Sequence, residues 1–412
     1  MNSRLLRNGT LPGAECASLL IDQAGKIERL GDGLIVPDQV EEIDCEGKLI
    51  LPGMFDMHVH ACDPGNEHRE TLASARAAAQ RGGITGMLMM PDTSPAIDSG
   101  AMVDRVQERV AALGEMPMLS AGCLTLGGAG EKLSGIARLA RSGVRVLTDA
   151  GMSTPPPDVL RTAMHYARDY DLTVAIQGDT PSLTRHGAMN EGAMSYRLGL
   201  PGSPAVAEEM GIDQAIRLAQ DTKVRLHIHQ LSTALGVEMV RRAKADGFSV
   251  TAEVSVCHLL FDESAVGSYD TRFKLRPPLR LESDRLALLA GVIDGTIDVI
   301  VSGHSPATLF EKSAEFALAP TGVSGLETSL LALFDRLILT GDLSWEILIE
   351  RFSTAPREIL GIEVPKFESG RRDDFLIFDP GGESKIDPAK LASKGPTTPF
   401  AGEILKGQIV RI

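Results

Sequence analysis

The sequence has few aromatic residues, no paired cysteine motif, no long apolar run and fewer basic than acidic residues. Aromatic side chains make up 4% of the 412 residues, whereas glycine occurs 42 times and proline 23 times. A hydrophobic content of 43% with so many turn-forming residues is typical of a large globular α/β protein. The formal charge of −14 argues against a nucleic-acid partner, because binding a phosphate backbone needs a basic surface.

The five cysteines are scattered and include no Cys-x-x-Cys pair, so the sequence predicts neither a disulfide framework nor a zinc knuckle. We expect free thiols in a reducing compartment. The first residues carry charges but no apolar leader segment, and no apolar run is long enough to span a membrane. These absences predict a cytoplasmic protein that binds small molecules or other proteins.

Apolar strand patterns alternate with helical patterns over most of the chain. Strands are expected at 51–60, 86–90, 117–120, 143–147, 172–176, 224–229, 250–254 and 297–301. Helices such as 70–80, 102–113 and 158–170 fill the gaps between them. This rhythm predicts an α/β fold, and specifically a (β/α)₈ TIM barrel, with a doubly wound sheet as the alternative.

Short strand patterns recur at both ends of the chain, at 18–25, 42–50, 374–378 and 402–412. We expect residues 1–52 and 358–412 to form one small β-sandwich domain. This discontinuous domain would flank a barrel of residues 53–357.

Asp56, His58 and His60 stand at alternate positions of the first barrel strand. Because alternate side chains of a strand share a face, the two imidazoles can reach one metal ion together with the carboxylate. The alternative is that these strand-end histidines only form hydrogen bonds with their neighbours.

Several longer motifs occur in the order seen in dihydroorotases. They include Leu51-Pro-Gly-Met-Phe-Asp-Met-His-Val-His60, Met90-Pro-Asp-Thr93, Pro277-Pro-Leu-Arg280 and Gly325-Leu-Glu-Thr328. The sequence resembles this family of the amidohydrolase superfamily over nearly its whole length, and most closely the branch associated with aspartate transcarbamoylase. The resemblance implies a metal-activated hydroxide that attacks a cyclic amide, while an aspartate after the eighth strand moves the proton.

The resemblance also implies positions for two metal ions. Carried over to this chain, these positions are His58, His60, Asp149, Gly303, Gln177 and His229. Asp149 would bridge the two ions, but Gln177 and Gly303 replace family ligands, so a binuclear centre is not expected. One zinc ion at His58, His60 and Asp149, with His229 nearby, is one expectation, and a metal-free protein is the other. Asp149 could instead cap a loop, and His227 is expected to pack.

Catalytic and substrate-binding positions depart from the family pattern as well. Gly303 leaves no intact catalytic base, and losing such a base typically costs about 10²- to 10⁴-fold in rate. Cys62 and Asp92 replace an arginine and an asparagine that hold the substrate carboxylate in the family. Arg276 stands where an asparagine is usual, while Ala307 and Cys257 replace histidines. An anionic substrate should therefore bind weakly.

Three of these residues have further possible roles. Cys62 and Cys257 could be thiolate ligands of zinc, although isolated cysteines are more often small buried hydrophobic residues. Asp92 is a possible substitute base.

Two functions compete on this evidence. The first is a catalytically inactive dihydroorotase homologue, a homo-oligomer that serves as scaffold or partner of aspartate transcarbamoylase. The second is a weak or altered zinc-dependent hydrolase of a cyclic amide or imide without a carboxylate.

Overall fold

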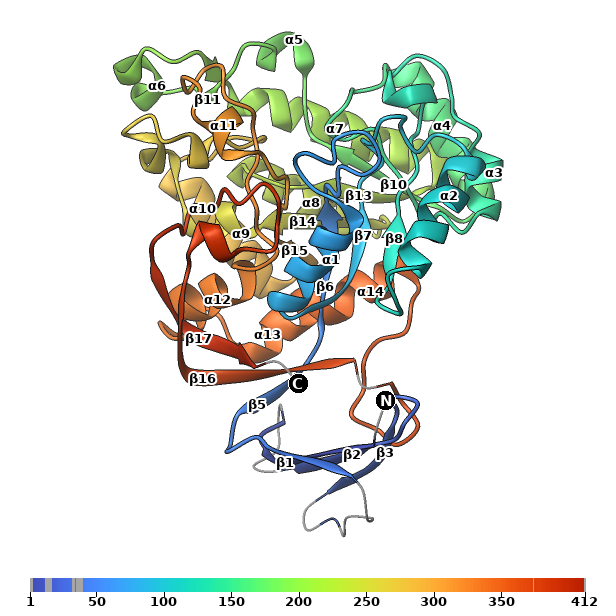
Figure 1. Cartoon of the computed structure of the whole chain (residues 1–412). Coiled ribbons are helices and arrows are strands. Elements are labelled where there is room, and N and C mark those ends of the chain that lie inside the picture. The colour runs from blue at the N-terminus through green and yellow to red at the C-terminus, as the bar shows by residue number, and fades with distance from the viewer. Residues whose placement is uncertain (1–2, 12–16, 32–33, 35–39, 373, 411–412) are drawn as a thin grey trace.

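The structure is a computed structural model that describes residues 3–11, 17–31, 34, 40–372 and 374–410 (Figure 1). Eight strands succeed one another through its larger part. They are β6 (Met54–Val59), β7 (Ile84–Met89), β8 (Met118–Ser120), β9 (Val146–Leu147), β10 (Thr173–Gln177), β13 (Arg225–His229), β14 (Val250–Ser255) and β15 (Val299–Val301). Each overlaps a predicted strand, because a short apolar run between turn residues is typical of a buried strand.

These strands form two parallel sheets whose edges are joined by isolated bridges. One sheet has the order β6-β7-β8 and the other the order β15-β14-β13-β10-β9. A bridge between Gly122 and Leu147 continues β8 into β9, and one between Val59 and His304 brings the end of β15 back to β6. We call this circuit of parallel strands the strand ring. The predicted α/β class with parallel strands is confirmed.

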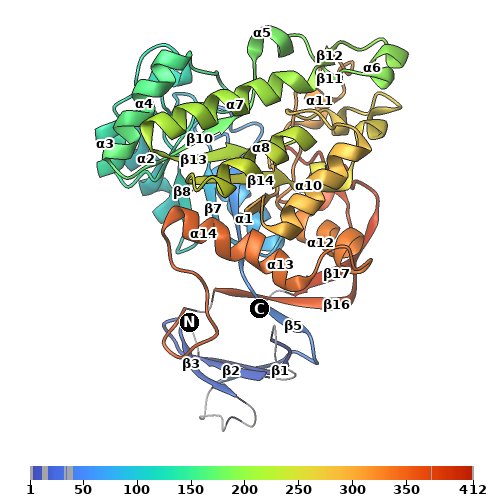
Figure 2. The same cartoon turned by 180° about the vertical axis from the view of Figure 1, so that it is seen from behind.

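Helices lie around the strand ring, as the two opposite views show (Figures 1 and 2). The longer ones are α1 (Leu72–Arg81), α2 (Gly100–Ala111), α4 (Pro157–Asp169), α7 (Ala205–Thr222), α8 (Ala234–Ala245) and α10 (Glu282–Asp294). The shorter ones are α3 (Ile136–Arg141), α5 (Pro181–Thr184), α6 (Ala193–Leu198), α9 (Val256–Leu260), α11 (Leu309–Lys312), α12 (Ser329–Leu333), α13 (Trp345–Ile349) and α14 (Ala355–Leu360). No described helix combines the length and the apolar character needed to cross a bilayer.

Helix α1 illustrates how the sequence sets these elements. Thr71 and Ser74 form a capping box in which each side chain accepts the backbone N–H of the other residue. The alanines on one face of the helix are buried. The helix ends at Gly82, where a Cβ atom would lie 1.8 Å from the carbonyl oxygen of Leu326, so only glycine permits this close approach.

Both chain ends contribute to the strands drawn below the ring in Figure 1. The strands are β1 (Arg4–Gly9), β2 (Ala17–Ile21), β3 (Ile27–Gly31), β4 (Glu41–Asp44), β5 (Leu49–Pro52), β16 (Phe375–Lys385) and β17 (Ile404–Val410). They form one sheet in the order β3-β2-β1-β4 and another in the order β17-β16-β5, with Leu6, Ile50 and Ile377 in one shared apolar cluster. Because β17 also packs on α12, the boundaries of a separate sandwich domain stay a prediction.

An apolar cluster fills part of the strand ring. Phe55, Leu88, Val146 and Val299 come from four different strands and pack together with Leu360 of α14. Buried polar residues gather instead where the strands lead into their C-terminal loops. In parallel α/β folds, functional side chains lie at these strand ends.

Candidate metal centre

His58 of β6 and His229 of β13 meet at the carboxylate of Glu253, which lies on β14. Oε1 of Glu253 is 2.5 Å from Nδ1 of His58 and 3.0 Å from Nδ1 of His229. The two Nδ1 atoms are 3.2 Å apart, and all three residues are buried. One ligand atom from each residue lies within 4.8 Å of the others, an arrangement that can hold a metal ion.

The second oxygen of Glu253 contacts a further histidine. Nε2 of His227 lies 3.0 Å from Oε2, and Nδ1 of His227 lies 2.8 Å from the hydroxyl of Thr251. His227 is thus held by polar contacts on both ring nitrogens and not by packing alone. Burial would raise the pKa of Glu253, but the neighbouring His229 and His58 and the hydrogen bond with His227 bring it well below its ordinary value. The carboxylate is therefore an anion shared by three imidazoles.

His60 has a carboxylate partner of its own. Its Nδ1 lies 2.6 Å from Oδ2 of Asp92, in the loop after β7. The ring of His58 lies 5.3 Å from that of His60 and 4.6 Å from that of His229, measured between centroids. Burial would lower the pKa of His60, but Asp92 raises it overall. The structure thus places the ring of His58 next to those of His60 and His229, and their role as metal ligands stays a prediction.

The Nδ1 contacts leave Nε2 as the free ring nitrogen of His58, His60 and His229. Nε2 of His229 is buried and has no hydrogen-bond partner among the described residues. Burial lowers the pKa of His229 to about 4, so its imidazole is neutral at neutral pH, which is the form that binds metals. Ligating histidines commonly hold a carboxylate on the other ring nitrogen, which fixes the orientation of the ring. The group of His58, His229 and Glu253 offers imidazole nitrogens and a carboxylate oxygen, which are ligands that zinc accepts.

Asp149, the expected bridging ligand, makes contacts with the loop after β8. Its Oδ1 accepts the backbone N–H of Leu124 at 2.8 Å and that of Thr125 at 3.2 Å, and its Oδ2 accepts the hydroxyl of Thr125. These are the contacts of a loop-capping aspartate. The carboxylate of Asp56 likewise accepts the backbone N–H groups of His58 and Ser302. Ligation by Asp149 stays a prediction.

Gly303 follows β15 with a φ of +63°. A Cβ atom there would lie 3.0 Å from Cβ of Ser255 and 3.4 Å from Nε2 of Gln230. Two ionisable residues close to Gly303 in the sequence, Asp298 and His304, already have hydrogen-bond partners. Asp298 accepts from Lys244 at 2.7 Å, and Nε2 of His304 lies 3.1 Å from Oε2 of Glu70.

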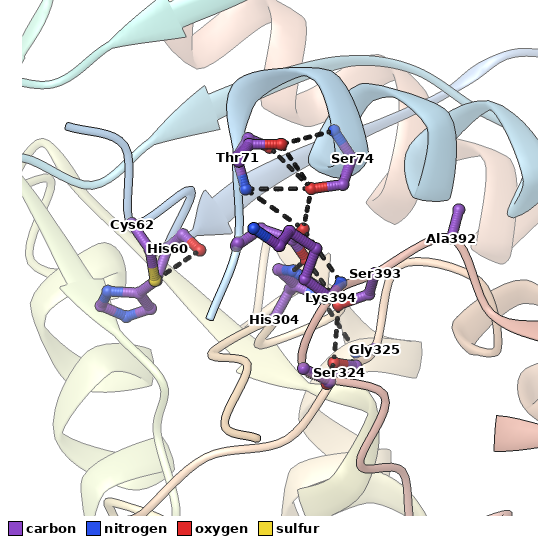
Figure 3. A network of polar contacts seen from close by, with 12 residues as sticks. His60, Cys62, Thr71, Ser74, His304, Ser324, Gly325, Ala392, Ser393 and Lys394 are labelled. Carbon is purple, nitrogen blue, oxygen red and sulfur yellow. Dashed lines mark hydrogen bonds and ion pairs between the residues drawn. The ribbon is translucent and has the colours of Figure 1, made fainter. Parts of the chain in front are cut away.

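Glu70 is the centre of a buried polar network that ties α1 to the loop after β15 and to the C-terminal segment. Its carboxylate also accepts from the hydroxyls of Ser74 and Ser393. Figure 3 shows Ser74, His304 and Ser393 converging from these three segments. The network thus gives the imidazole of His304 a buried carboxylate partner, Glu70.

Of the two cysteines considered as ligands, Cys62 is half-buried and Cys257 is buried. Cys62 donates to the carbonyl oxygen of His60 at 3.6 Å (Figure 3), and burial raises the pKa of the Cys62 thiol to about 12. Burial also raises the pKa of Cys257 to about 12. Neither thiol is ionised near neutral pH, which favours the hydrophobic interpretation. The described cysteines are all free, and Cys16 lies outside the described residues.

A cleft lies next to His60, at the ends of β9 and β10. Its lining includes Asp149, Gly151, Gln177, Asp179 and Arg276. A Cβ atom on Gly151 would lie 3.4 Å from Cε1 of His60, so this side of the cleft is next to the imidazole. Ala307, another altered family position, is buried, and its carbonyl oxygen accepts the hydroxyl of Thr397 at 3.2 Å.

Glu253 is the site residue that sequence reasoning missed. It lies within Thr251-Ala-Glu-Val254, a further segment in which the sequence resembles dihydroorotases, but the resemblance alone gave it no role. Two signals were present: a glutamate in an otherwise apolar strand needs a partner when buried, and the neighbouring strand carries histidines at alternate positions.

Comparison with known proteins agrees with this fold. Residues 47–235 match the family described as Dihydro-orotase-like. A dihydroorotase of Pelotomaculum thermopropionicum is 39% identical over 383 residues, which cover 93% of this chain and 89% of the relative. One of Caldanaerobacter subterraneus is 38% identical over 397 residues, which cover 96% and 91%.

Solved structures resemble the whole chain. An L-hydantoinase (dihydropyrimidinase) of Arthrobacter aurescens aligns with a TM-score of 0.87 and 22% identity, over 100% of this chain and 94% of the other. A dihydropyrimidinase of Brevibacillus agri aligns with a TM-score of 0.86 and 20% identity, over 99% and 93%. The fold is that of these two solved structures. The sequence identities place the chain more narrowly: it belongs to the dihydroorotase-like family.

Proposed function

We propose that the chain is a zinc-dependent hydrolase that opens a cyclic amide or imide, with weak or altered substrate specificity. The observation that carries the proposal is the group of three imidazoles, each with a carboxylate on Nδ1. His58 and His229 would hold the ion with His60 alongside, and Glu253 and Asp92 would orient these imidazoles. When bound, zinc supplies Lewis-acid polarisation of a carbonyl and activates water.

The residues of the chain limit how fast such a reaction runs. Gly303 offers no proton acceptor, and both oxygens of Glu253 are engaged by imidazoles. We therefore expect turnover about 10²- to 10⁴-fold below that of an enzyme with a general base in place. Because the imidazole group is intact, we expect slow turnover and not a complete absence of catalytic activity.

The hydrolase is supported by relatives named dihydroorotase at 38–39% identity and by the imidazole group. Four further expectations stay untested predictions. They are a non-catalytic scaffold role, aspartate transcarbamoylase as partner, a homo-oligomeric state and a cytoplasmic location.

The test measures bound zinc and turnover on the same protein. The zinc-loaded chain is assayed with dihydroorotate, dihydrouracil, hydantoin and succinimide, beside His229→Ala and the exposed control His186→Ala. We expect about one zinc per chain and slow hydrolysis of at least one ring, both lost in His229→Ala only. A zinc-loaded protein that opens none of these rings would contradict the proposal.

A further inference from the structure

Gln230, directly after β13, combines a strained backbone with a buried side chain that has no protein partner. Its φ is +44°, a left-handed value that residues other than glycine rarely adopt. The residue is 8% exposed, and among the described residues no group forms a hydrogen bond with its carboxamide. Burying an amide without a hydrogen bond is costly, and strained residues cluster at functional sites. Both features indicate that this carboxamide binds something other than the protein.

The carboxamide faces Gly303, which stands where the family has its catalytic base. Nε2 of Gln230 lies 3.4 Å, and Oγ of Ser255 3.6 Å, from the point where a Cβ atom on Gly303 would lie. Gly303 is half-buried, whereas Gln230 and Ser255 are buried. An oxygen atom close to this point, shifted slightly away from Cβ of Ser255, can form hydrogen bonds with both the amide and the hydroxyl. The two side chains can therefore bind one water molecule beside the glycine.

Ser255 is in turn paired with a histidine. Its Oγ lies 2.7 Å from Nδ1 of His258, and Nε2 of His258 lies 3.1 Å from the carbonyl oxygen of Pro277. Because a carbonyl oxygen only accepts, Nε2 carries the ring proton and Nδ1 accepts the hydroxyl of Ser255. Burial lowers the pKa of His258 to about 4, so the imidazole is neutral near neutral pH. Burial also makes the protonated form costly, which agrees with slow turnover.

A purely structural role accounts for only part of this arrangement. Ser255 is the N-cap of α9, and its Oγ accepts the backbone N–H of His258 at 3.4 Å. Capping explains why a serine stands at this position. It does not explain why an unpartnered carboxamide lies beside the hydroxyl on the open side of Gly303.

We propose that Gln230, Ser255 and His258 form a proton-transfer site that replaces the missing aspartate. Gln230 and Ser255 bind a water molecule beside Gly303. When the attacking water forms its bond with the ring carbonyl carbon, it gives a proton to this bound water. The bound water gives a proton to Oγ of Ser255, whose own proton moves to Nδ1 of His258. The proton returns along the same path to the ring nitrogen as the C–N bond breaks, so His258 ends each turnover neutral. The transfer rests on the proposed function, because it serves that hydrolysis.

The water site can be tested without turnover. A crystal structure of the unmodified, metal-free chain should show an ordered water molecule within hydrogen-bonding distance of Nε2 of Gln230 and Oγ of Ser255. Gln230→Leu removes the amide and should lose this water. Gln80→Leu, exposed at the end of α1, is the matched control and should keep it. An unmodified chain without an ordered water at this place would overturn the proposal.

The proton transfer is tested by turnover of the zinc-loaded chain in mixtures of ordinary and heavy water. We expect kcat to depend on the deuterium fraction along a curve, because several protons move in one step, and along a straight line in Ser255→Ala and His258→Gln. Each variant should lower kcat about 10²-fold, with KM and bound zinc unchanged. The double variant should lose no more than either single one, because both interrupt one path. Ser344→Ala, which removes the N-cap of α13, is the control for losing a cap.

The outcomes separate the proton-transfer site from the hydrolase. A straight-line dependence in the unmodified chain, or an unchanged kcat in Ser255→Ala, would overturn the site and leave the proposed hydrolase in place. A zinc-loaded chain that opens no ring would contradict the hydrolase, and the proton transfer with it, even where the water beside Gly303 is present.

Discussion

Oε1 of Glu253 lies 2.5 Å from Nδ1 of His58, and the same oxygen lies 3.0 Å from Nδ1 of His229. One carboxylate oxygen thus orients two imidazoles that come from different strands. Glu253→Gln keeps the shape of the side chain but removes its charge and one acceptor oxygen. Because outer carboxylates of this kind typically contribute 10- to 100-fold to metal affinity, we expect a loss of about that size in competition with a chelating dye. Glu238→Gln, on the surface of α8, should leave zinc affinity unchanged. Full affinity in Glu253→Gln would show that the carboxylate does not support the site.

Asp92 makes the equivalent contact with His60 from a different strand end. Asp92→Ala removes the acceptor 2.6 Å from Nδ1, so His60 can rotate and should bind zinc less well. We expect zinc affinity to fall about 10-fold or more, by analogy with other outer-shell carboxylates. The exposed Asp104→Ala is the matched control. Equal zinc affinity in the two variants would place Asp92 outside the metal site.

How far the sequence predicts this site depends on how many residues separate the contacting partners along the chain. His58 and His60 lie on the same face because alternate residues of a strand do so, and this can be predicted from the local sequence alone. The contact of His58 with Glu253 spans 195 residues, and that of Arg276 with Asp179 spans 97. Such contacts need the order of the strands and the path of each loop. The loop after β8, which engages Asp149, has no periodic signal at all, so its hydrogen bonds could not be predicted.

Replacing Gly303 should lower the stability of the fold for local reasons that the family pattern does not reveal. Gly303→Asp would place a side chain at a φ of +63° and a Cβ atom 3.0 Å from that of Ser255. We expect a loss of about 1 to 2 kcal/mol in the free energy of unfolding, measured by urea denaturation. Gly247→Asp, at a φ of +80° with no atom within 4 Å, suffers the backbone strain alone. The difference in the free energy of unfolding between the two variants measures the crowding against Ser255.

Dihydroorotate turnover should not rise in Gly303→Asp, because Cys62, Asp92 and Gln177 remain. A rise would show that the missing aspartate alone limits the reaction.

Lys312 of α11 should make stability depend on pH. Its ammonium group is buried and donates to the carbonyl oxygens of Thr271 and Pro320, both at 2.9 Å. Burial lowers the pKa of Lys312 from 10.5 to about 7. Between these two values the unfolded chain binds more protons than the folded chain, so this lysine makes stability rise with pH, by up to about 1.4 kcal/mol per pH unit. Its contribution is fully present above the unfolded value and is lost as the pH falls toward the folded value.

Lys312→Met removes this titration and leaves two buried carbonyl groups without their donor. At pH 9.5 we expect the variant to be less stable than the unmodified chain by about 1 to 3 kcal/mol. The gap should narrow on going to pH 7.5, because the unmodified chain loses stability over that interval and the variant lacks this loss. Urea denaturation at both pH values measures the gap, with the exposed Lys132→Met as the control for losing a lysine. A gap that stays constant between the two pH values would mean that Lys312 remains charged inside the fold, with its hydrogen bonds to Thr271 and Pro320 compensating for burial.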